Sequence, residues 1–209
     1  MVRILIADDH AIVRKGLKQL LLEEFPAAVL GEVENAEQLV SKVLVQKWDV
    51  VICDLSMPGR SGLDALQQLR HSCPGLPVLI MSMHSEDQYA IRVLRAGASG
   101  FLGKDSIHED LIKAIHTVLK GKKFITPSVA EKLADVFNRG SVQSPHETLS
   151  NREFDVFKLL ASGKSVSEIA TQLSLSVTTV STYRARILEK MQMKNNAELT
   201  RYGIENDLV

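Results

Sequence analysis

Residues 49–59 have the sequence DVVICDLSMPG, in which a short apolar run ends at an aspartate and a turn sequence follows. An apolar run of this length is typical of a strand that is buried on both faces of a sheet. Proline and glycine after the run favour the backbone conformations of a tight turn. The stretch therefore predicts a buried strand at residues 49–53 with Asp54 at its carboxyl end.

The sequence on either side alternates between strand-like and helix-like patterns. Apolar runs predict further strands at residues 2–7, 29–33, 77–81 and 97–102. Helical spacing of apolar residues predicts helices at residues 11–24, 36–46, 62–71, 86–96 and 107–119. Helical crossovers between short buried strands are typical of a parallel sheet with helices on both faces. We therefore expect an α/β domain over residues 1–122, a doubly wound (βα)5 parallel sheet.

The composition is that of a globular chain, and its 209 residues leave room for two domains. A hydrophobic content of 45% with 24% charged residues can bury a core, which argues against a disordered chain. The net charge of zero does not exclude nucleic acid as a partner, because a local basic patch is sufficient. Cys53 and Cys73 are too few for a disulfide framework, and Cys53 is expected in the core.

Targeting signals are missing from the sequence pattern. The N-terminal apolar stretch is short and ends in acidic residues, unlike a secretory signal. No segment approaches the roughly 18 apolar residues of a membrane span. We therefore expect a cytoplasmic protein without a membrane partner.

The pattern changes after residue 122. Residues 127–138 predict a helix that starts at a Thr-Pro pair, and a polar stretch rich in breakers follows, so residues 123–148 are expected to form a linker with a helix. Residues 149–209 are helical throughout and predict a small all-α helix-turn-helix domain. Serines followed three residues later by glutamate predict capping boxes, and a third serine predicts another N-cap: Ser150, Ser165 and Ser176.

Aspartates stand at the ends of two predicted strands. Asp8 and Asp9 end the first strand, and Asp54 ends the third. The ends of these two strands are neighbours in such a sheet, at the edge where α/β folds bind ligands, so the carboxylates are expected to converge. Their mutual repulsion is relieved by a hard cation such as Mg²⁺. The cation also neutralises an incoming phosphoryl group and leaves one carboxylate as a nucleophile.

Two further strand ends complete this set. Ser82 ends the fourth strand and offers a hydroxyl, while Lys104 follows the fifth and offers a cation for phosphoryl oxygens. A lone aspartate after a strand is usually a cap or turn residue, and a lone lysine is usually solvated. All five residues fall on the ligand-binding edge of the sheet, which favours a shared phosphoryl site.

With the Met-Pro-Gly turn after Asp54, these residues make the first 121 or so positions resemble the receiver domain of two-component response regulators, which is CheY-like in fold. The resemblance implies that Asp54 is the phosphoacceptor and that Asp8 and Asp9 form the acidic pocket. It implies Mg²⁺ ligands and phosphoryl-binding residues as well: Asp9, Asp54 and the Ser56 carbonyl for the metal, and Ser82 and Lys104 for the phosphoryl oxygens. Ser56 and His84 occupy positions that affect loss of the phosphoryl group in this family. Phe101 matches the switch aromatic of the family, with a plain core aromatic as the alternative.

The second helix of the predicted helix-turn-helix, residues 177–191, is basic. Residues 181–194 carry four basic residues and one acidic residue, a net charge of +3 in a neutral protein. A basic helix after the tight turn at residues 173–176 suits the major groove and phosphates of DNA. The alternative is an ordinary solvated helix face.

Residues 149–209 resemble the LuxR-type DNA-binding domain, through the patterns Leu-Ser-x-Arg-Glu, Glu-Ile-Ala, Ser-x-x-Thr-Val and Ile-x-x-Lys-Met. Receiver and LuxR-type domain together resemble NarL/FixJ-type regulators. The resemblance implies that Ser181, Thr182 and Ala185 face base edges, where small side chains offer little bidentate readout. Phosphate contacts are then expected from Arg184, Arg186 and Lys190, with a guanine contact as the alternative for Arg184. The final helix, residues 197–208, either covers the core or adds a dimer contact.

The resulting prediction is a transcription regulator rather than an enzyme. A histidine kinase phosphorylates Asp54, and an equilibrium between two existing states shifts. The chain then dimerises, or releases its recognition helix, and binds double-stranded DNA as a homodimer. Three alternatives remain at this point: a constitutive DNA binder with a vestigial receiver, a small phosphoryl-transfer enzyme, and a protein-binding adaptor.

Overall fold

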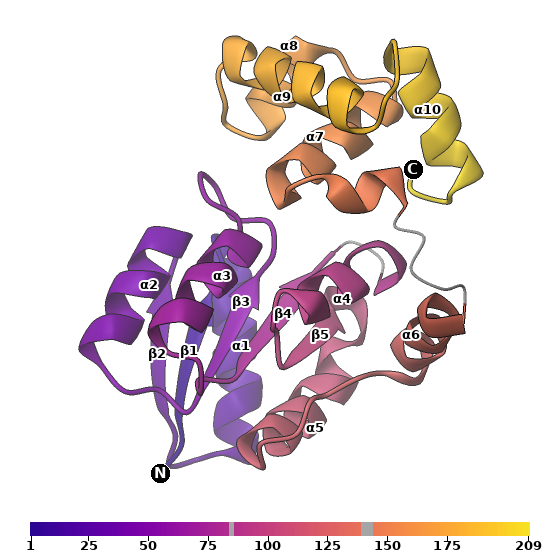
Figure 1. The fold of residues 1–209 in the computed structure, drawn as a ribbon. Helices are drawn as coiled ribbons and strands as arrows, with labels where there is room; N and C mark the ends of the chain where they lie inside the picture. Colours follow the sequence, from indigo (N-terminus) through magenta and orange to yellow (C-terminus); the bar gives the residue numbers. More distant parts are fainter. Residues whose placement is uncertain (84–85, 139–143) are drawn as a thin grey trace. The chain divides into compact units, whose positions relative to one another are not determined.

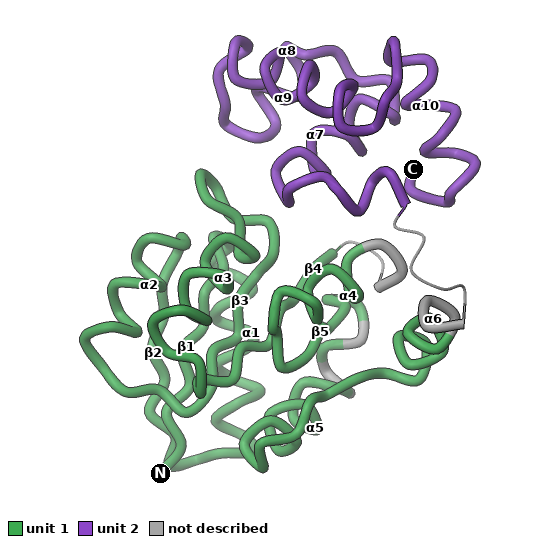
Figure 2. The backbone as a smooth tube through the Cα atoms, viewed as in Figure 1, with its two compact units in different colours: residues 1–138 green, residues 139–209 purple. Residues whose placement is uncertain are grey.

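The computed structural model describes residues 1–83, 86–138 and 144–209. It divides into two compact units, residues 1–138 and residues 139–209 (Figure 2). The first unit holds the sheet and the second is helical, so the prediction of an α/β domain followed by a small all-α domain is confirmed. His84 and residues 139–143 of the predicted linker lie outside the described residues.

The sheet of the first unit has five parallel strands in the order β2-β1-β3-β4-β5 (Figure 1). Their bounds are β1 Arg3–Ala7, β2 Val29–Val33, β3 Val50–Asp54, β4 Val78–Ser82 and β5 Gly100–Gly103. The apolar run of β3 is buried at every position, as a central strand covered on both faces requires. The order places the carboxyl ends of β1 and β3 side by side, as the sequence predicted.

Strand β5 begins later than the predicted strand at residues 97–102. Gly97 has a φ of 100°, a left-handed conformation in which the chain closes the preceding helix instead of extending. The N–H of Gly97 donates to the carbonyl of Leu94, and the N–H of Ala98 donates to that of Val93. Gly97 and Ala98, which the apolar pattern assigned to the strand, therefore belong to the turn that ends the helix.

Helices cover both faces of the sheet (Figure 1). Their bounds in this unit are α1 Ala11–Glu24, α2 Ala36–Val45, α3 Gly62–Ser72, α4 Glu86–Arg95, α5 Ile107–Leu119 and α6 Pro127–Asn138, with a 3-10 turn η1 at Lys104–Ser106. Apolar side chains of α1 and α5 form one buried core with strand residues, among them Leu21, Ile115, Ile6 and Ile52. Helix α6, predicted as part of the linker, packs against α4 and lies in the first unit. The functional boundaries at residues 122 and 149 stay a prediction.

The loop after β3 is held close to the strand end. Gly59 adopts a φ of 75°, which a glycine tolerates at a turn. A Cβ on Gly62 would lie 2.0 Å from the carbonyl oxygen of Asp54, so only glycine permits this approach. Ser61 and Asp64 form a capping box at the start of α3 that the sequence analysis missed. These features fix the backbone around Asp54 and Ser56.

The second unit packs its helices around buried aromatic residues, chiefly Phe154 and Phe157. Its elements are a 3-10 turn η2 Pro145–Thr148, α7 Asn151–Ala161, α8 Val166–Gln172, α9 Val177–Lys190 and α10 Asn196–Glu205. Capping boxes at Ser150 and Ser165 and the N-cap at Ser176 are all present, as predicted. Among the described residues, no helix is both long and apolar enough to cross a membrane.

Candidate functional site

Three buried polar side chains lie at the carboxyl ends of adjacent strands. Asp8 directly follows β1, Asp54 is the last residue of β3, and Ser82 is the last residue of β4. All three residues are buried, although aspartate and serine are usually exposed in proteins. Register places Asp54 beside Met81 across the β3–β4 pair, one residue before Ser82. The strand order therefore brings this predicted set to one edge of the sheet.

Lys104 joins two of these carboxylates. It begins η1, directly after β5, and its Nζ lies 2.7 Å from Oδ2 of Asp8 and 3.1 Å from Oδ1 of Asp54. Burial alone would lower the pKa of Lys104, but the hydrogen bond to Asp8 and the charges of both carboxylates outweigh it and raise the pKa. Lys104 is therefore a cation held between Asp8 and Asp54.

The negative charge of Asp54 is disfavoured by its position in the protein. Burial raises the pKa of Asp54 above its usual range, and the neighbouring charge of Asp8 adds to the rise. Lys104 and the backbone N–H of Ser56 offset only part of this effect. Burial also raises the pKa of the Cys53 thiol beside it, so Cys53 stays protonated and is a core residue, as predicted.

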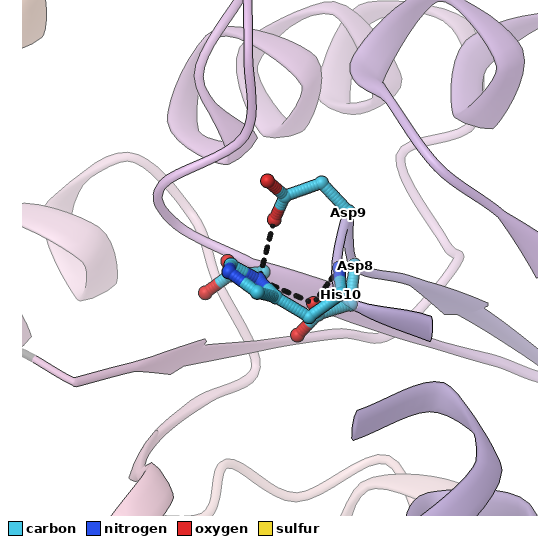
Figure 3. Close-up of side chains that lie close together, drawn as sticks. Asp8, Asp9 and His10 are labelled. Atoms are coloured by element: carbon cyan, nitrogen blue, oxygen red, sulfur yellow. Dashed lines mark hydrogen bonds and ion pairs between the residues drawn. The ribbon is translucent and has the colours of Figure 1, made fainter. Parts of the chain in front are cut away.

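Asp9 and His10 lie beside Asp8 and are both more exposed than it (Figure 3). Ligand atoms of Asp8, Asp9, His10 and Asp54 all lie within 4.8 Å of one another. Oδ1 of Asp9 is buried and accepts no hydrogen bond from the described residues, although it lies 2.8 Å from Nδ1 of His10. A carboxylate oxygen left without a hydrogen-bond donor among several acidic groups fits a hard divalent cation. Asp9 and Asp54 are thus suitable metal ligands in their observed positions.

The switch candidates lie on the neighbouring strands. Ser82 pairs in register with Gly103 of β5, and Gly103 is the residue directly before Lys104. The backbone of Ser82 therefore lies close to the backbone of Lys104. Phe101 is 3% exposed on β5, in register with Ile80. A buried aromatic at this position is compatible with both roles considered for it. Its role as a switch stays a prediction.

Two residues that were not predicted from the sequence shape this site. Arg14 of α1 is buried, and its Nη1 donates to the backbone carbonyl of Asp8 at 2.7 Å. Its Nη2 donates to Glu34 at 2.6 Å, which ties α1 to the chain after β2. Nothing local distinguishes this arginine from a solvated one. His10, by contrast, directly follows Asp8 and Asp9 in the sequence, and this adjacency could have predicted its place beside them.

The predicted DNA-contacting residues lie on α9, whose buried face is formed by Val180 and Ile187. Five of the residues named from the sequence are exposed: Ser181, Thr182, Ala185, Arg186 and Lys190. Arg184 is half-buried, and its Nε donates to Oδ1 of Asn196 at 2.7 Å, at the start of α10. Helix α9 therefore has an open face with a basic side chain, beside a second arginine held by α10.

Lys190 has an internal partner that the sequence did not reveal. Its Nζ lies 2.7 Å from Oε2 of Glu153, the buried glutamate of the α7 capping box. Burial raises the pKa of Glu153, but hydrogen bonds from Lys190 and Ser150 prevail and hold the pKa below its usual range. The pair ties the end of α9 to the beginning of α7. A phosphate contact by Lys190 stays a prediction.

Comparison with known families agrees with both units. Residues 4–116 match the family described as response regulator receiver domain. Residues 147–203 match the family described as bacterial regulatory proteins, luxR family. The two matches lie in separate units of the fold.

Known proteins of similar length match this chain over almost all of its residues. Response regulator GacA of Pseudomonas protegens is 34% identical over 209 residues, covering 100% of this chain and 98% of that protein. The oxygen regulatory protein NreC of Staphylococcus carnosus is 36% identical over 214 residues, covering 99% of each. Response regulator UvrY of Escherichia coli strain K12 is 32% identical, covering 100% of this chain and 96% of that protein.

Solved structures of the RcsB response regulator are similar as well. One from Salmonella typhimurium has a TM-score of 0.62 at 30% identity and covers 97% of this chain and 98% of that one. Another, RcsB from Salmonella enterica serovar Typhimurium bound to a promoter with the phosphomimetic BeF3⁻, has a TM-score of 0.64 at 28% identity, covering 96% and 97%. The chain therefore belongs to the NarL/FixJ-type two-component response regulators, which join a receiver domain to a LuxR-type helix-turn-helix domain.

Proposed function

We propose that the chain is a phosphorylation-controlled transcription regulator in which Asp54 accepts a phosphoryl group from a histidine kinase. A carboxylate oxygen of Asp54 attacks the phosphorus of the phosphohistidine. The bond between phosphorus and imidazole nitrogen breaks, and an acyl phosphate forms on Asp54. The chain is thus a phosphoryl acceptor with slow self-dephosphorylation, within a family of DNA-binding regulators.

One observation carries this proposal: a single lysine, its side chain 10% exposed, contacts two carboxylates at the sheet edge. Lys104 pairs with both Asp8 and Asp54, so a cation already stands where phosphoryl oxygens arrive. In the proposed step Lys104 shifts its hydrogen bonds toward those oxygens, and the Ser82 hydroxyl donates another. Phe101, buried on the adjacent strand, then changes rotamer as Ser82 moves toward the phosphoryl group.

The metal site belongs to the same proposal. Asp9, Asp54 and the backbone carbonyl of Ser56 would hold Mg²⁺, with Asp8 completing the acidic pocket. When bound, the ion supplies positive charge that offsets the charge of the phosphoryl group. The loop after β3 holds Ser56 beside Asp54, and the backbone N–H of Ser56 already donates to that carboxylate.

We further propose that the second unit, with residues 149–209 as its functional domain, binds double-stranded DNA through α9. Ser181, Thr182 and Ala185 face base edges, and Arg184, Arg186 and Lys190 contact phosphates. The exposure of five of these residues on α9 supports this. RcsB has been solved bound to a promoter, and RcsB dimers have been solved on DNA. By analogy, this chain acts as a homodimer on paired half-sites, in the cytoplasm.

The test is a matched pair of full-length proteins, wild type and Asp54→Ala, treated with acetyl phosphate and Mg²⁺. Phosphate-affinity gels and intact mass should show one phosphoryl adduct in the wild type alone. Gel shifts on a promoter fragment should then show tighter, salt-sensitive binding of the phosphorylated protein. An unmodified wild type that still binds the promoter equally well would instead favour a constitutive regulator with a vestigial receiver.

A further inference from the structure

We propose that His10 is an additional ligand of the metal site, a nitrogen donor that lets the site bind transition-metal cations such as Mn²⁺ and Ni²⁺ as well as Mg²⁺. The inference rests on the metal site of the proposed function and adds a residue that the sequence did not assign to it. Its basis is the position of the imidazole relative to the two aspartates that precede it.

The contact distances are those of neighbouring atoms in one coordination shell. Nδ1 of His10 lies 2.8 Å from Oδ1 of Asp9 and 3.3 Å from Oδ1 of Asp8 (Figure 3). In an octahedral shell with bonds of about 2.1 Å, adjacent ligand atoms stand about 3 Å apart. Oδ1 of Asp9 accepts no hydrogen bond from the described residues, so the histidine contact leaves it available to a cation. One ion can therefore be reached by Asp9 and His10 together.

The local backbone explains why the imidazole lies there. His10 is the N-cap residue of α1 and has an extended backbone, with φ −88° and ψ 109°. Its N–H donates to Oδ1 of Asp8 at 2.8 Å, which curls the chain back toward the acidic pair. The side chain makes no capping hydrogen bond to α1, so the imidazole is not committed to the helix start. Its 62% exposure allows the ring to adjust to an ion without repacking the core.

Ligand chemistry predicts how the metal preference changes. Carboxylate oxygens suit Mg²⁺ and Mn²⁺, whereas an imidazole nitrogen suits Ni²⁺ and Zn²⁺. A site with only oxygen ligands binds these ions in the usual order of their affinities and discriminates little beyond that. Adding one nitrogen ligand strengthens the binding of Ni²⁺ much more than that of Mg²⁺. His10→Ala should therefore weaken Ni²⁺ binding by about tenfold and Mg²⁺ binding by less than about twofold.

Mn²⁺ gives a direct readout that does not depend on phosphorylation. Full-length protein is loaded with Mn²⁺ alone, and electron spin-echo spectroscopy detects ¹⁴N bonded to the ion. We expect ¹⁴N modulation in the wild type and its loss in His10→Ala, which still binds Mn²⁺ through carboxylates. His116→Ala is the matched control, since His116 lies beside Glu24 at 3.1 Å, away from the acidic cluster, and should keep the modulation. Labelling the wild type with ¹⁵N-histidine should change the modulation to that of ¹⁵N, independently of any variant.

The outcomes separate this inference from the proposed function. Bound Mn²⁺ without nitrogen modulation in the wild type would overturn the role of His10 and leave the oxygen-ligand site standing. Modulation that persists in His10→Ala would overturn it too, because another nitrogen would be responsible. A wild type that binds neither Mn²⁺ nor Mg²⁺ would overturn the metal site of the proposed function itself.

Discussion

Nζ of Lys104 lies 3.1 Å from Oδ1 of Asp54, across the end of the intervening strand β4. Both side chains are at least nine-tenths buried. A charge removed from water is costly unless a partner of opposite sign is close. The fold supplies that partner to the proposed phosphoacceptor before any phosphodonor arrives.

Removing this cation is expected to destabilise the first unit. Lys104→Met should lower the free energy of unfolding by about 3 kcal/mol in metal-free buffer, because the buried carboxylates lose their counter-charge. Urea denaturation followed by circular dichroism measures the loss. Mg²⁺ should restore part of it. The double variant Lys104→Met/Asp54→Asn should be more stable than the sum of the two single effects predicts, by about 1 kcal/mol or more. Strictly additive effects would show that the two groups do not interact.

Neutralising Asp54 should have the opposite effect, with a defined pH dependence. The folded-state pKa of Asp54 is raised, so the folded chain retains this proton to higher pH than the unfolded chain. Its contribution to stability therefore declines as pH rises from the ordinary aspartate range through the folded pKa. Asp54→Asn, which cannot ionise, should gain stability over the wild type progressively as pH rises above the ordinary aspartate range. Urea unfolding in EDTA at several pH values tests this.

The control for that experiment is Glu131→Gln, a neutralised carboxyl on the exposed side of α6. Its difference from the wild type, measured at the same pH values, gives the baseline for removing one exposed carboxyl. A flat difference for Asp54→Asn would mean that burial does not penalise the Asp54 charge.

The Glu153–Lys190 pair should stabilise the second unit at neutral pH. Glu153→Gln is expected to cost about 2 kcal/mol, since a buried charged hydrogen bond is lost. Amide hydrogen exchange in α7 should then accelerate by about 30-fold. The pKa of Glu153 is lowered, so its stabilisation is present above the ordinary glutamate range and is lost as pH falls through the folded pKa. Below that pH, wild type and Glu153→Gln should converge.

Glu189→Gln provides the comparison, because Glu189 is exposed on α9 next to Lys190. It should leave exchange in α7 unchanged. Equal acceleration in both variants would indicate a general charge effect on α9 and not the specific pair.

Alanine variants of two arginines on α9 should distinguish phosphate contacts from base contacts in DNA binding. Arg186→Ala is expected to weaken binding to specific and random duplexes by the same factor and to reduce the salt slope by about one. Arg184→Ala should do the same if Arg184 contacts phosphate; a larger loss on the specific duplex would identify a guanine contact. Fluorescence anisotropy at several salt concentrations measures both. Arg201→Ala, on the exposed side of α10, should leave binding unchanged.

Local patterns predicted most elements well. The alternation of strands and helices, the buried run ending at Asp54 and the caps at Ser150, Ser165 and Ser176 all depend on residues within one turn or strand. The predicted start of β5 was wrong because Gly97 adopts a left-handed conformation that ends the preceding helix, although the apolar run favoured a strand there. The predicted linker helix packs against α4, and the apolar pattern of α6 does not show which side of the linker it will join.

By itself, the sequence determined the order of the elements, the two domain types and the strand ends that carry Asp8, Asp54 and Ser82, because periodicity and capping act over a few residues. Only the tertiary structure decided the partners of the charged side chains. Lys104 contacts Asp8 and Asp54, and Lys190 contacts Glu153. These residues are far apart in the sequence, and only the strand order and the helix packing bring them together. A direct ion pair needs its two charged groups within about 4 Å, and residues far apart in the chain reach that distance only through the fold.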